Sequence, residues 1–233
     1  LYLIAQGYVK KSNLKIQIGI LLLIPVVVAF IRFPRTCFYL ILLSIILGVI
    51  YSVPPIRLKG KPFLDLFTNA FGFGIVAFAV GWVSRSDFSK ELILDSLPYV
   101  ICVSAAFINT TIPDIAGDVQ NGDLTTGAFL GIRKSCIAST ILVSIVPLIA
   151  WLRGDFICFI ASALSLPFFI YMTISNWNER MPKFSAITSA TKISLMLLSL
   201  LIGMFIPLYL ALLIFTVLLM RLYHQTRFGI NYP

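Results

Sequence analysis

The chain has 233 residues, of which 59% are hydrophobic and only 12% charged, and its mean hydropathy is +0.99. Soluble globular domains contain about 45–50% apolar and about 25% charged residues, so this composition excludes a soluble enzyme or binding module. The formal net charge of +9 could suggest nucleic-acid binding, but in a membrane protein the position of the basic residues matters more than their sum.

Apolar runs of about 17–25 residues are long enough to cross a bilayer as helices. Stretches such as IGILLLIPVVVAFI are apolar on every side, which excludes the alternation of a transmembrane barrel. The tract 185–222 contains Gly203 and Pro207 near its middle, which predicts two helices with a break, one long tilted helix being the alternative. The expected spans are about 14–32, 37–54, 65–84, 92–112, 134–152 and 156–175, followed by the tract 185–222.

The sequence therefore predicts an all-α, polytopic transmembrane helical bundle with seven or eight spans, forming a single membrane-embedded domain over residues 1–233. Its four cysteines include no C-x-x-C pair, and the only histidine is His224, so neither a zinc site nor a redox motif is indicated. We interpret the cysteines as small buried apolar side chains. They are Cys37, Cys102, Cys136 and Cys158.

The basic residues are divided unevenly between the two faces that alternating spans define. By the positive-inside rule the face richer in Lys and Arg is cytoplasmic. The polar loops 51–65 and 109–127 both lie on that richer face, so we expect an integral, multi-pass membrane protein with these loops in the cytoplasm. The opposite face holds Arg32, Arg35, Arg85, Lys90 and Arg153.

Three of the nine acidic residues fall in the stretch NTTIPDIAGDVQNGDLTTG, residues 109–127. If the helix continues, Asp114 and Asp118 project from the same side, and Asp123 follows Gly122 in a predicted turn. Unpaired carboxylates repel one another, and a charge deep in the bilayer costs about 2.5–3.5 kcal/mol. A divalent cation removes both penalties, and clustered carboxylates suit Mg²⁺. We predict a Mg²⁺ site on these three aspartates, with a solvated acidic loop as the alternative.

The second polar loop is YSVPPIRLKGKPFLD, residues 51–65. Its Pro-Pro pair ends the preceding helix and imposes an extended path. In an extended segment the alternating Arg57, Lys59 and Lys61 lie on one side, and Tyr51 sits at the helix end. Such a row of cations beside a Mg²⁺ site would bind a diphosphate. The alternative is an anchor that contacts anionic lipid head groups.

These two loops together carry a resemblance to a known family. YSVPPIRLKGKPFLDLFTNAFGFG followed by NTTIPDIAGDVQNGDLTTGAFLG resembles the UbiA superfamily of intramembrane prenyltransferases. The Tyr-Ser-x-Pro-Pro-x-x-Leu-Lys form is similar to the branch of chlorophyll synthases, homogentisate prenyltransferases and lycopene elongase-like enzymes. The resemblance implies about nine spans in a complete family member.

The resemblance also implies an activity, namely Mg²⁺-dependent transfer of a prenyl group from a prenyl diphosphate to a lipophilic acceptor within the membrane, with release of diphosphate. The expected cofactor is Mg²⁺. The expected partners are the prenyl diphosphate, the acceptor and membrane lipids, and no nucleic acid. The implied catalytic residues are Asp114, Asp118 and Lys59, with Asp123 close by in the second of the family's two aspartate-rich motifs.

Further residues are expected to bind the substrate. Tyr51, Arg57 and Lys59 belong to the implied basic loop near the diphosphate, and Lys61 extends the row. Polar side chains that enter the bilayer usually face a cavity, and helix capping is the alternative for Asp65. Glycines 72, 74 and 81 permit close helix packing or leave room for the prenyl chain. The intramembrane polar residues are Asp65, Asn69 and Asn109, and aromatic rings that could face an allylic cation are Tyr51, Phe71, Phe73 and Tyr99.

One departure from the family pattern is large. The first motif, of the form Asn-Asp-x-x-Asp-x-x-x-Asp, is absent from this sequence. Matching IAQGYVKKSNLK to the segment that follows that motif places the missing acids before Leu1. We therefore expect an N-terminally incomplete copy that lacks two helices and half of the metal site, and that is inactive by itself.

Three other classes remain open. A CDP-alcohol phosphotransferase requires an Asp-Gly element upstream of Asp114, which the sequence lacks. A small-molecule transporter could line a pathway with these charges, although the charges gather at one face instead of the bilayer midplane. A non-catalytic or degenerate family member would bind a lipid or a partner without chemistry.

Overall fold

The computed structural model describes residues 10–178 and 182–229. Across these residues every regular element is a helix, and eight helices are long and apolar enough to cross a membrane. Their large apolar side chains are extensively exposed, as expected for surfaces that face lipid instead of water. The predicted all-α polytopic bundle is confirmed.

The chain forms two compact units. The smaller unit holds residues 10–28 and 199–229, with most of α1 (Lys11–Arg32), the end of α9 (Phe184–Phe205) and α10 (Pro207–Phe228). The larger unit spans residues 29–198 and carries the two polar loops. Its further helices are α2 (Arg35–Ser52), α3 (Leu64–Asn69), a π-helical segment (Ala70–Val76), α4 (Ala77–Val83), α5 (Lys90–Thr111), α6 (Ile115–Gln120), α7 (Thr126–Leu152) and α8 (Phe156–Ser175).

The break predicted in the tract 185–222 is present. Helix α9 ends at Phe205 and α10 begins at Pro207, whose fixed φ and missing N–H suit the first turn of a helix. Gly203 lets the two helices approach closely, because a Cβ placed there would lie 2.8 Å from the Cβ of Leu210. The tract therefore forms two helices and not one long tilted helix.

The main core of the larger unit lies between α5, α7, α8 and α9. Apolar side chains from these four helices form one buried cluster, and the three buried cysteines are free thiols in contact with apolar neighbours, as the sequence predicts. This packing brings the end of α5 and the start of α7, which flank the acidic stretch, to the same end of the unit. The cluster consists of Ala105, Ile112, Cys136, Val143, Phe169, Met172, Ile187 and Ala190.

Three local features differ from the helical spans that the sequence predicts. Helix α7 begins at Thr126, eight residues before the expected start at 134, and it is kinked at Gly131, where φ is 74°. A short helix, α6, forms inside the acidic stretch after a 3₁₀ turn at Ile112–Asp114. The third span contains the π-helical segment, which apolar periodicity does not reveal because its composition is that of an ordinary span.

Only one of the three glycines of the third span is in close contact with another helix. A Cβ on Gly74 would lie 2.6 Å from the Cα of Val100, so this glycine allows the π-helical segment to pack directly on α5. Gly72 and Gly81 have no atom within 4 Å of such a Cβ. The expectation of close helix packing is thus confirmed for Gly74 alone.

Replacing Gly74 by alanine should destabilise the protein, because the added methyl group meets backbone atoms that cannot move independently. We expect Gly74→Ala to cost about 1–3 kcal/mol and to lower the midpoint of thermal unfolding in detergent micelles. Gly81→Ala is the matched control, and there the gain in helix propensity of about 0.5–1 kcal/mol should leave the midpoint unchanged or raised. Equal midpoints for the two variants would contradict the packing of Gly74 on α5.

Candidate functional site

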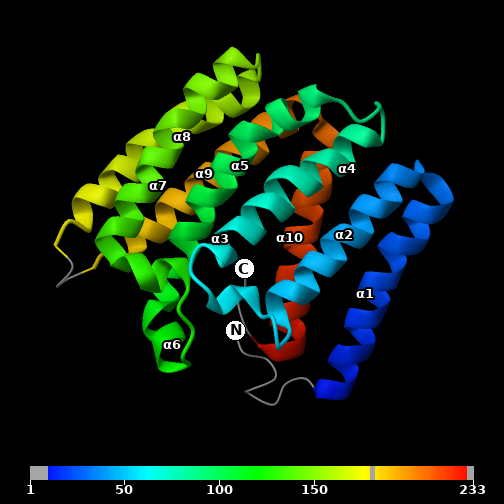
Figure 1. The fold of residues 1–233 in the computed structure, drawn as a ribbon, viewed down its shortest axis with the longest axis horizontal. Coiled ribbons are helices and arrows are strands. Elements are labelled where there is room, and N and C mark those ends of the chain that lie inside the picture. The colour runs from blue at the N-terminus through cyan, green and yellow to red at the C-terminus, as the bar shows by residue number, and fades with distance from the viewer. Residues whose placement is uncertain (1–9, 179–181, 230–233) are drawn as a thin grey trace. The chain divides into compact units, whose positions relative to one another are not determined.

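The two polar loops meet at one end of the larger unit. We name residues 53–63 the basic loop and residues 112–125 the acidic loop. The backbone N–H of Leu124 donates to the carbonyl of Gly60 over 3.2 Å, which joins the two loops directly. In Figure 1 the segment between α2 and α3 lies at the same end as α6, and the connection from α7 to α8 lies at the opposite end. The prediction that both loops share one face is consistent with this arrangement.

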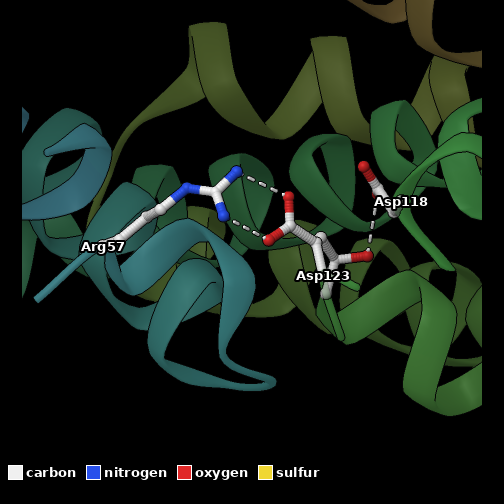
Figure 2. Close-up of polar contacts among 4 residues, drawn as sticks. Arg57, Asp118 and Asp123 are labelled. Carbon is white, nitrogen blue, oxygen red and sulfur yellow. Dashed lines mark hydrogen bonds and ion pairs between the residues drawn. The ribbon is translucent and has the colours of Figure 1, made fainter. Parts of the chain in front are cut away.

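An ion pair strengthens the junction between the loops. The guanidinium of Arg57 donates from Nη1 and Nη2 to the two carboxylate oxygens of Asp123, over 2.7 and 2.8 Å (Figure 2). The Asp123 side chain is only 10% exposed, and that of Arg57 is 39% exposed. Gly60 makes room for this carboxylate, since a Cβ there would lie 2.7 Å from its Oδ1. Two parallel hydrogen bonds fix both the distance and the orientation of the pair.

The basic loop is folded into a tight turn. The expectation of an extended segment with three cations on one side is wrong, because Leu58–Gly60 forms a 3₁₀ turn with Arg57 in the left-handed region at φ 39°. Lys59 is half-buried in this turn, and Lys61 follows it as an exposed residue. Arg57 points to Asp123, so the three cations do not form one row.

A second contact joins Asp65 and Thr126, which lie just after the two loops and whose side chains are both buried. Asp65, at the start of α3, has no exposed surface, and its Oδ2 accepts the N–H of Thr126 over 2.7 Å. Its Oδ1 accepts the hydroxyl of Thr126 in a short hydrogen bond and the N–H of Leu66 over 2.7 Å. The Thr126 oxygen in turn accepts the N–H of Phe63 over 2.8 Å. We name this set of four hydrogen bonds the clasp. It satisfies the first N–H of α7, one of those that a helix leaves without an internal partner.

The acidic loop places its two other aspartates differently. Asp114 is exposed at the end of the 3₁₀ turn, and Asp118 is half-buried in α6. The hydroxyl of Thr125 donates to Oδ2 of Asp118 over 3.1 Å. Asp118 lies within electrostatic range of Asp114, Asp123 and Lys59, and Figure 2 shows it beside the Arg57–Asp123 pair.

This geometry limits the candidate metal ligands. Among the described residues no group of three or more His, Cys, Asp and Glu side chains is placed to hold a metal ion. Both oxygens of Asp123, the third predicted metal ligand, accept from Arg57 in this structure. Asp114 and Asp118 remain as a pair of carboxylates. Two carboxylates fit Mg²⁺, which takes its other ligands from water and substrate phosphate.

A groove of about 310 Å³ lies beside this polar end. Tyr51 at the end of α2 lines this groove together with Asn69. Asn69 also donates from Nδ2 to the carbonyl of Asp65 over 2.9 Å. The structure thus brings the predicted residues Tyr51 and Asn69 together at one side of the groove. The groove is lined by Ser44, Leu47, Gly48, Tyr51, Thr68, Asn69, Gly72 and Phe73.

Asn109 lies away from the loop surface, inside the helix core. It is 1% exposed, and its Nδ2 is 3.4 Å from the hydroxyl oxygen of Thr191 on α9. Its Oδ1 has no hydrogen-bond partner among the described residues. Asn109 therefore connects α5 to α9.

Tyr99 lies near the other end of α5. Its hydroxyl donates over 2.5 Å to Asp155, which also accepts the N–H of Cys158 and so caps α8. Tyr99 is thus committed to a structural hydrogen bond far from the acidic loop. Asp95, on the same helix as Tyr99, is paired with Arg153 over 2.6 Å.

Sequence reasoning missed Thr125 and Thr126. Both are at least 90% buried, and they connect the acidic loop to α7. The available signal was the pair Thr-Thr directly before Gly127, because Ser and Thr often begin helices. It was hidden by the apolar pattern, which places the start of the span at 134.

The fold and the site together define a class, namely a polytopic helical membrane protein with a charged site at one end of its helices. Residues 3–188 match the sequence model described as the UbiA prenyltransferase family. The match covers more than half of the chain, which therefore belongs to the UbiA prenyltransferase family. The general activity of this family is prenyl transfer. No curated protein and no solved structure gives a significant match.

The ion pair between Arg57 and Asp123 should be strongly coupled. We expect a double-mutant cycle with Arg57→Gln and Asp123→Asn to give a coupling free energy of about 1–3 kcal/mol in unfolding, because the carboxylate is buried and the contact is bidentate. The Arg153–Asp95 pair is the control, since both of its side chains are about 30% exposed. Its coupling should stay below about 1 kcal/mol. Similar couplings for both pairs would refute the role of Arg57 and Asp123 in joining the loops.

Proposed function

We propose that this protein transfers a prenyl group from a prenyl diphosphate to a lipophilic acceptor within the membrane, in a Mg²⁺-dependent reaction that releases diphosphate. Family membership supports prenyl transfer in general. The observation that carries the finer proposal is the junction of the basic and acidic loops, where Leu124 donates to the carbonyl of Gly60, the residue after Lys59, and so brings the loop of Lys59 to the loop of Asp118. A cation and a carboxylate side by side suit a metal-bound polyphosphate.

The charged residues of the two loops have different roles in the proposed reaction, according to their contacts. Asp114 and Asp118 are the residues that would hold Mg²⁺, which neutralises negative charge on the diphosphate as it leaves. Lys59 and Lys61 supply fixed positive charge for the same oxygens. Arg57 acts through Asp123, by keeping the basic loop against the acidic loop. The reaction then breaks the bond between the allylic carbon and the diphosphate oxygen and joins that carbon to the acceptor, which loses a proton; diphosphate leaves with the electron pair of the broken bond.

The groove beside Tyr51 is proposed to take apolar substrate. Its wall is mainly apolar, and its polar members Tyr51 and Asn69 lie next to the charged end. An amphiphile could place its charged head at the charged end and its apolar tail in the groove. The positive-inside rule supports a cytoplasmic position of the loops. The Tyr-Ser-x-Pro-Pro form, which resembles that of chlorophyll synthases, homogentisate prenyltransferases and lycopene elongase-like enzymes, favours an isoprenoid or aromatic acceptor in this proposal.

The acidic pair should be required for transfer. In the full-length protein we expect Asp118→Asn and Asp114→Asn each to reduce Mg²⁺-dependent transfer from a radiolabelled prenyl diphosphate by at least about 100-fold, because the loss of one carboxylate removes one of two protein ligands. Asp87→Asn, in the loop before α5, is the control and should retain activity.

Retained transfer in the acidic variants would overturn the metal assignment. A wild-type protein that binds prenyl diphosphate without turning it over would support a non-catalytic family member instead. Uptake of a solute into vesicles without transfer would favour a transporter.

Lys59 should contribute mainly to the binding of the diphosphate group. We expect Lys59→Ala to raise the KM for prenyl diphosphate by about tenfold, in line with the loss of one charge-assisted hydrogen bond. Lys90→Ala, at the start of α5 and near the opposite end, removes the same charge and should leave KM unchanged. An unchanged KM in Lys59→Ala would exclude its contact with the substrate.

A further inference from the structure

We propose that Asp65 and Thr126 are positioning residues, which hold the basic and acidic loops together through the clasp and do not contact substrate. The inference concerns a carboxylate that the sequence assigns to substrate binding. Its link to catalysis rests on the proposed function, whereas the clasp itself is a property of the fold.

The hydrogen bonds of Asp65 leave its carboxylate committed to the protein. Three donors converge on it, namely the N–H groups of Leu66 and Thr126 and the Thr126 hydroxyl. The direction of the last bond follows from chemistry, because an ionised carboxylate can only accept: the Thr126 hydroxyl donates to Asp65, and its oxygen accepts the N–H of Phe63. A fully buried carboxylate is costly without such donors. A substrate or metal ion would have to displace them to reach it.

The clasp reaches the acidic loop through two consecutive residues. Thr126 is held by Asp65, and the adjoining Thr125 donates its hydroxyl to Asp118 while its oxygen accepts the N–H of Ala128 over 3.3 Å. Thr125 is 8% exposed and is the capping residue of α7. The position of the Asp118 carboxylate is therefore coupled to that of Asp65 through a Thr-Thr pair with little freedom to rotate.

The clasp reaches the basic loop from its other side. The N–H of Asp65 donates to the carbonyl of Lys61 over 3.1 Å, and Phe63 donates to Thr126. The ring of Phe63 also contacts that of Phe129 on α7, edge to face, with centroids 5.4 Å apart. The turn that carries Lys59 is thus attached to α7 as well as to α3. Asp65 is the one carboxylate in these contacts with connections to both loops.

The test compares three substitutions in the full-length protein. Thr126→Val preserves the shape of the side chain and removes the hydroxyl. Thr126→Ser keeps the hydroxyl and serves as the conservative rescue. Asp65→Asn replaces one carboxylate oxygen by an NH₂ group, which cannot accept the hydrogen bonds that this oxygen accepts. Gly74→Ala is the matched control, because it perturbs packing on α5 without touching the clasp.

The first measurement requires no metal and no substrate. Hydrogen–deuterium exchange is followed in peptides that cover residues 58–66 and 118–130. We expect Thr126→Val and Asp65→Asn to exchange about tenfold faster in both peptides, since each leaves a buried polar group without its partner. Thr126→Ser and Gly74→Ala should match the wild type there. Acceleration in neither peptide, or in only one, would overturn the clasp as the link between the loops.

The second measurement separates positioning from simple stability. The Mg²⁺ concentration that gives half-maximal prenyl transfer should rise about 10–100-fold in Thr126→Val and Asp65→Asn, as is usual when residues behind metal ligands are altered. It should be unchanged in Thr126→Ser and Gly74→Ala below their unfolding midpoints. A variant with faster exchange in both loops and a normal Mg²⁺ response would show a structural role only. Absence of Mg²⁺-dependent transfer in the wild type would refute the proposed function and its link to the clasp, while the exchange experiment would still decide the clasp.

Discussion

The buried carboxylate of Asp65 is the constraint on which the polar end of this protein depends. A carboxylate removed from water must be surrounded by donors, and the start of α7, which lies against Asp65, has backbone N–H groups that need acceptors. One hydrogen bond satisfies both groups, because the Asp65 carboxylate accepts the N–H of Thr126, 61 residues further along the chain. The contact brings together loops that two membrane spans separate. The Arg57–Asp123 pair joins the same two loops by a second, separate contact.

The ion pair determines which charges remain for a ligand. Arg57 and Asp123 neutralise each other in a bidentate contact, so one cation and one acid of the two loops are used within the protein. Lys59, Lys61, Asp114 and Asp118 are left at or near the surface. The formal charges of the two lysines and the two aspartates sum to zero. A metal ion bound by the aspartates would therefore make the net charge of the site positive, so that it would attract anions.

The sequence was sufficient for the spans, for the break before Pro207 and for the turn that places Asp123 after Gly122, because these follow from apolar runs and from the conformational limits of Pro and Gly. It did not reveal the partners of the charged residues. Asp123 resembles its neighbours Asp114 and Asp118 in the sequence, and only the tertiary distance to Arg57 distinguishes it. The tight turn at Leu58–Gly60 was missed for a similar reason, since the three alternating cations of residues 57–61 are equally compatible with an extended path. An acid such as Asp65 inside an apolar span does indicate a buried partner, but the hydroxyl of Thr126 is one of many candidates.

The π-helical segment explains how a close-packed bundle keeps a groove next to its charged end. Gly74 faces α5 and brings the backbone of the segment against Val100, whereas Gly72, two residues earlier, faces the groove with Tyr51 and Asn69. The same short segment therefore closes one side against a neighbouring helix and leaves the other side open. Because α3 precedes the segment directly, the clasp that holds Asp65 also determines where this open side begins. The charged end and the apolar groove thus lie next to each other in the larger unit, joined through α3.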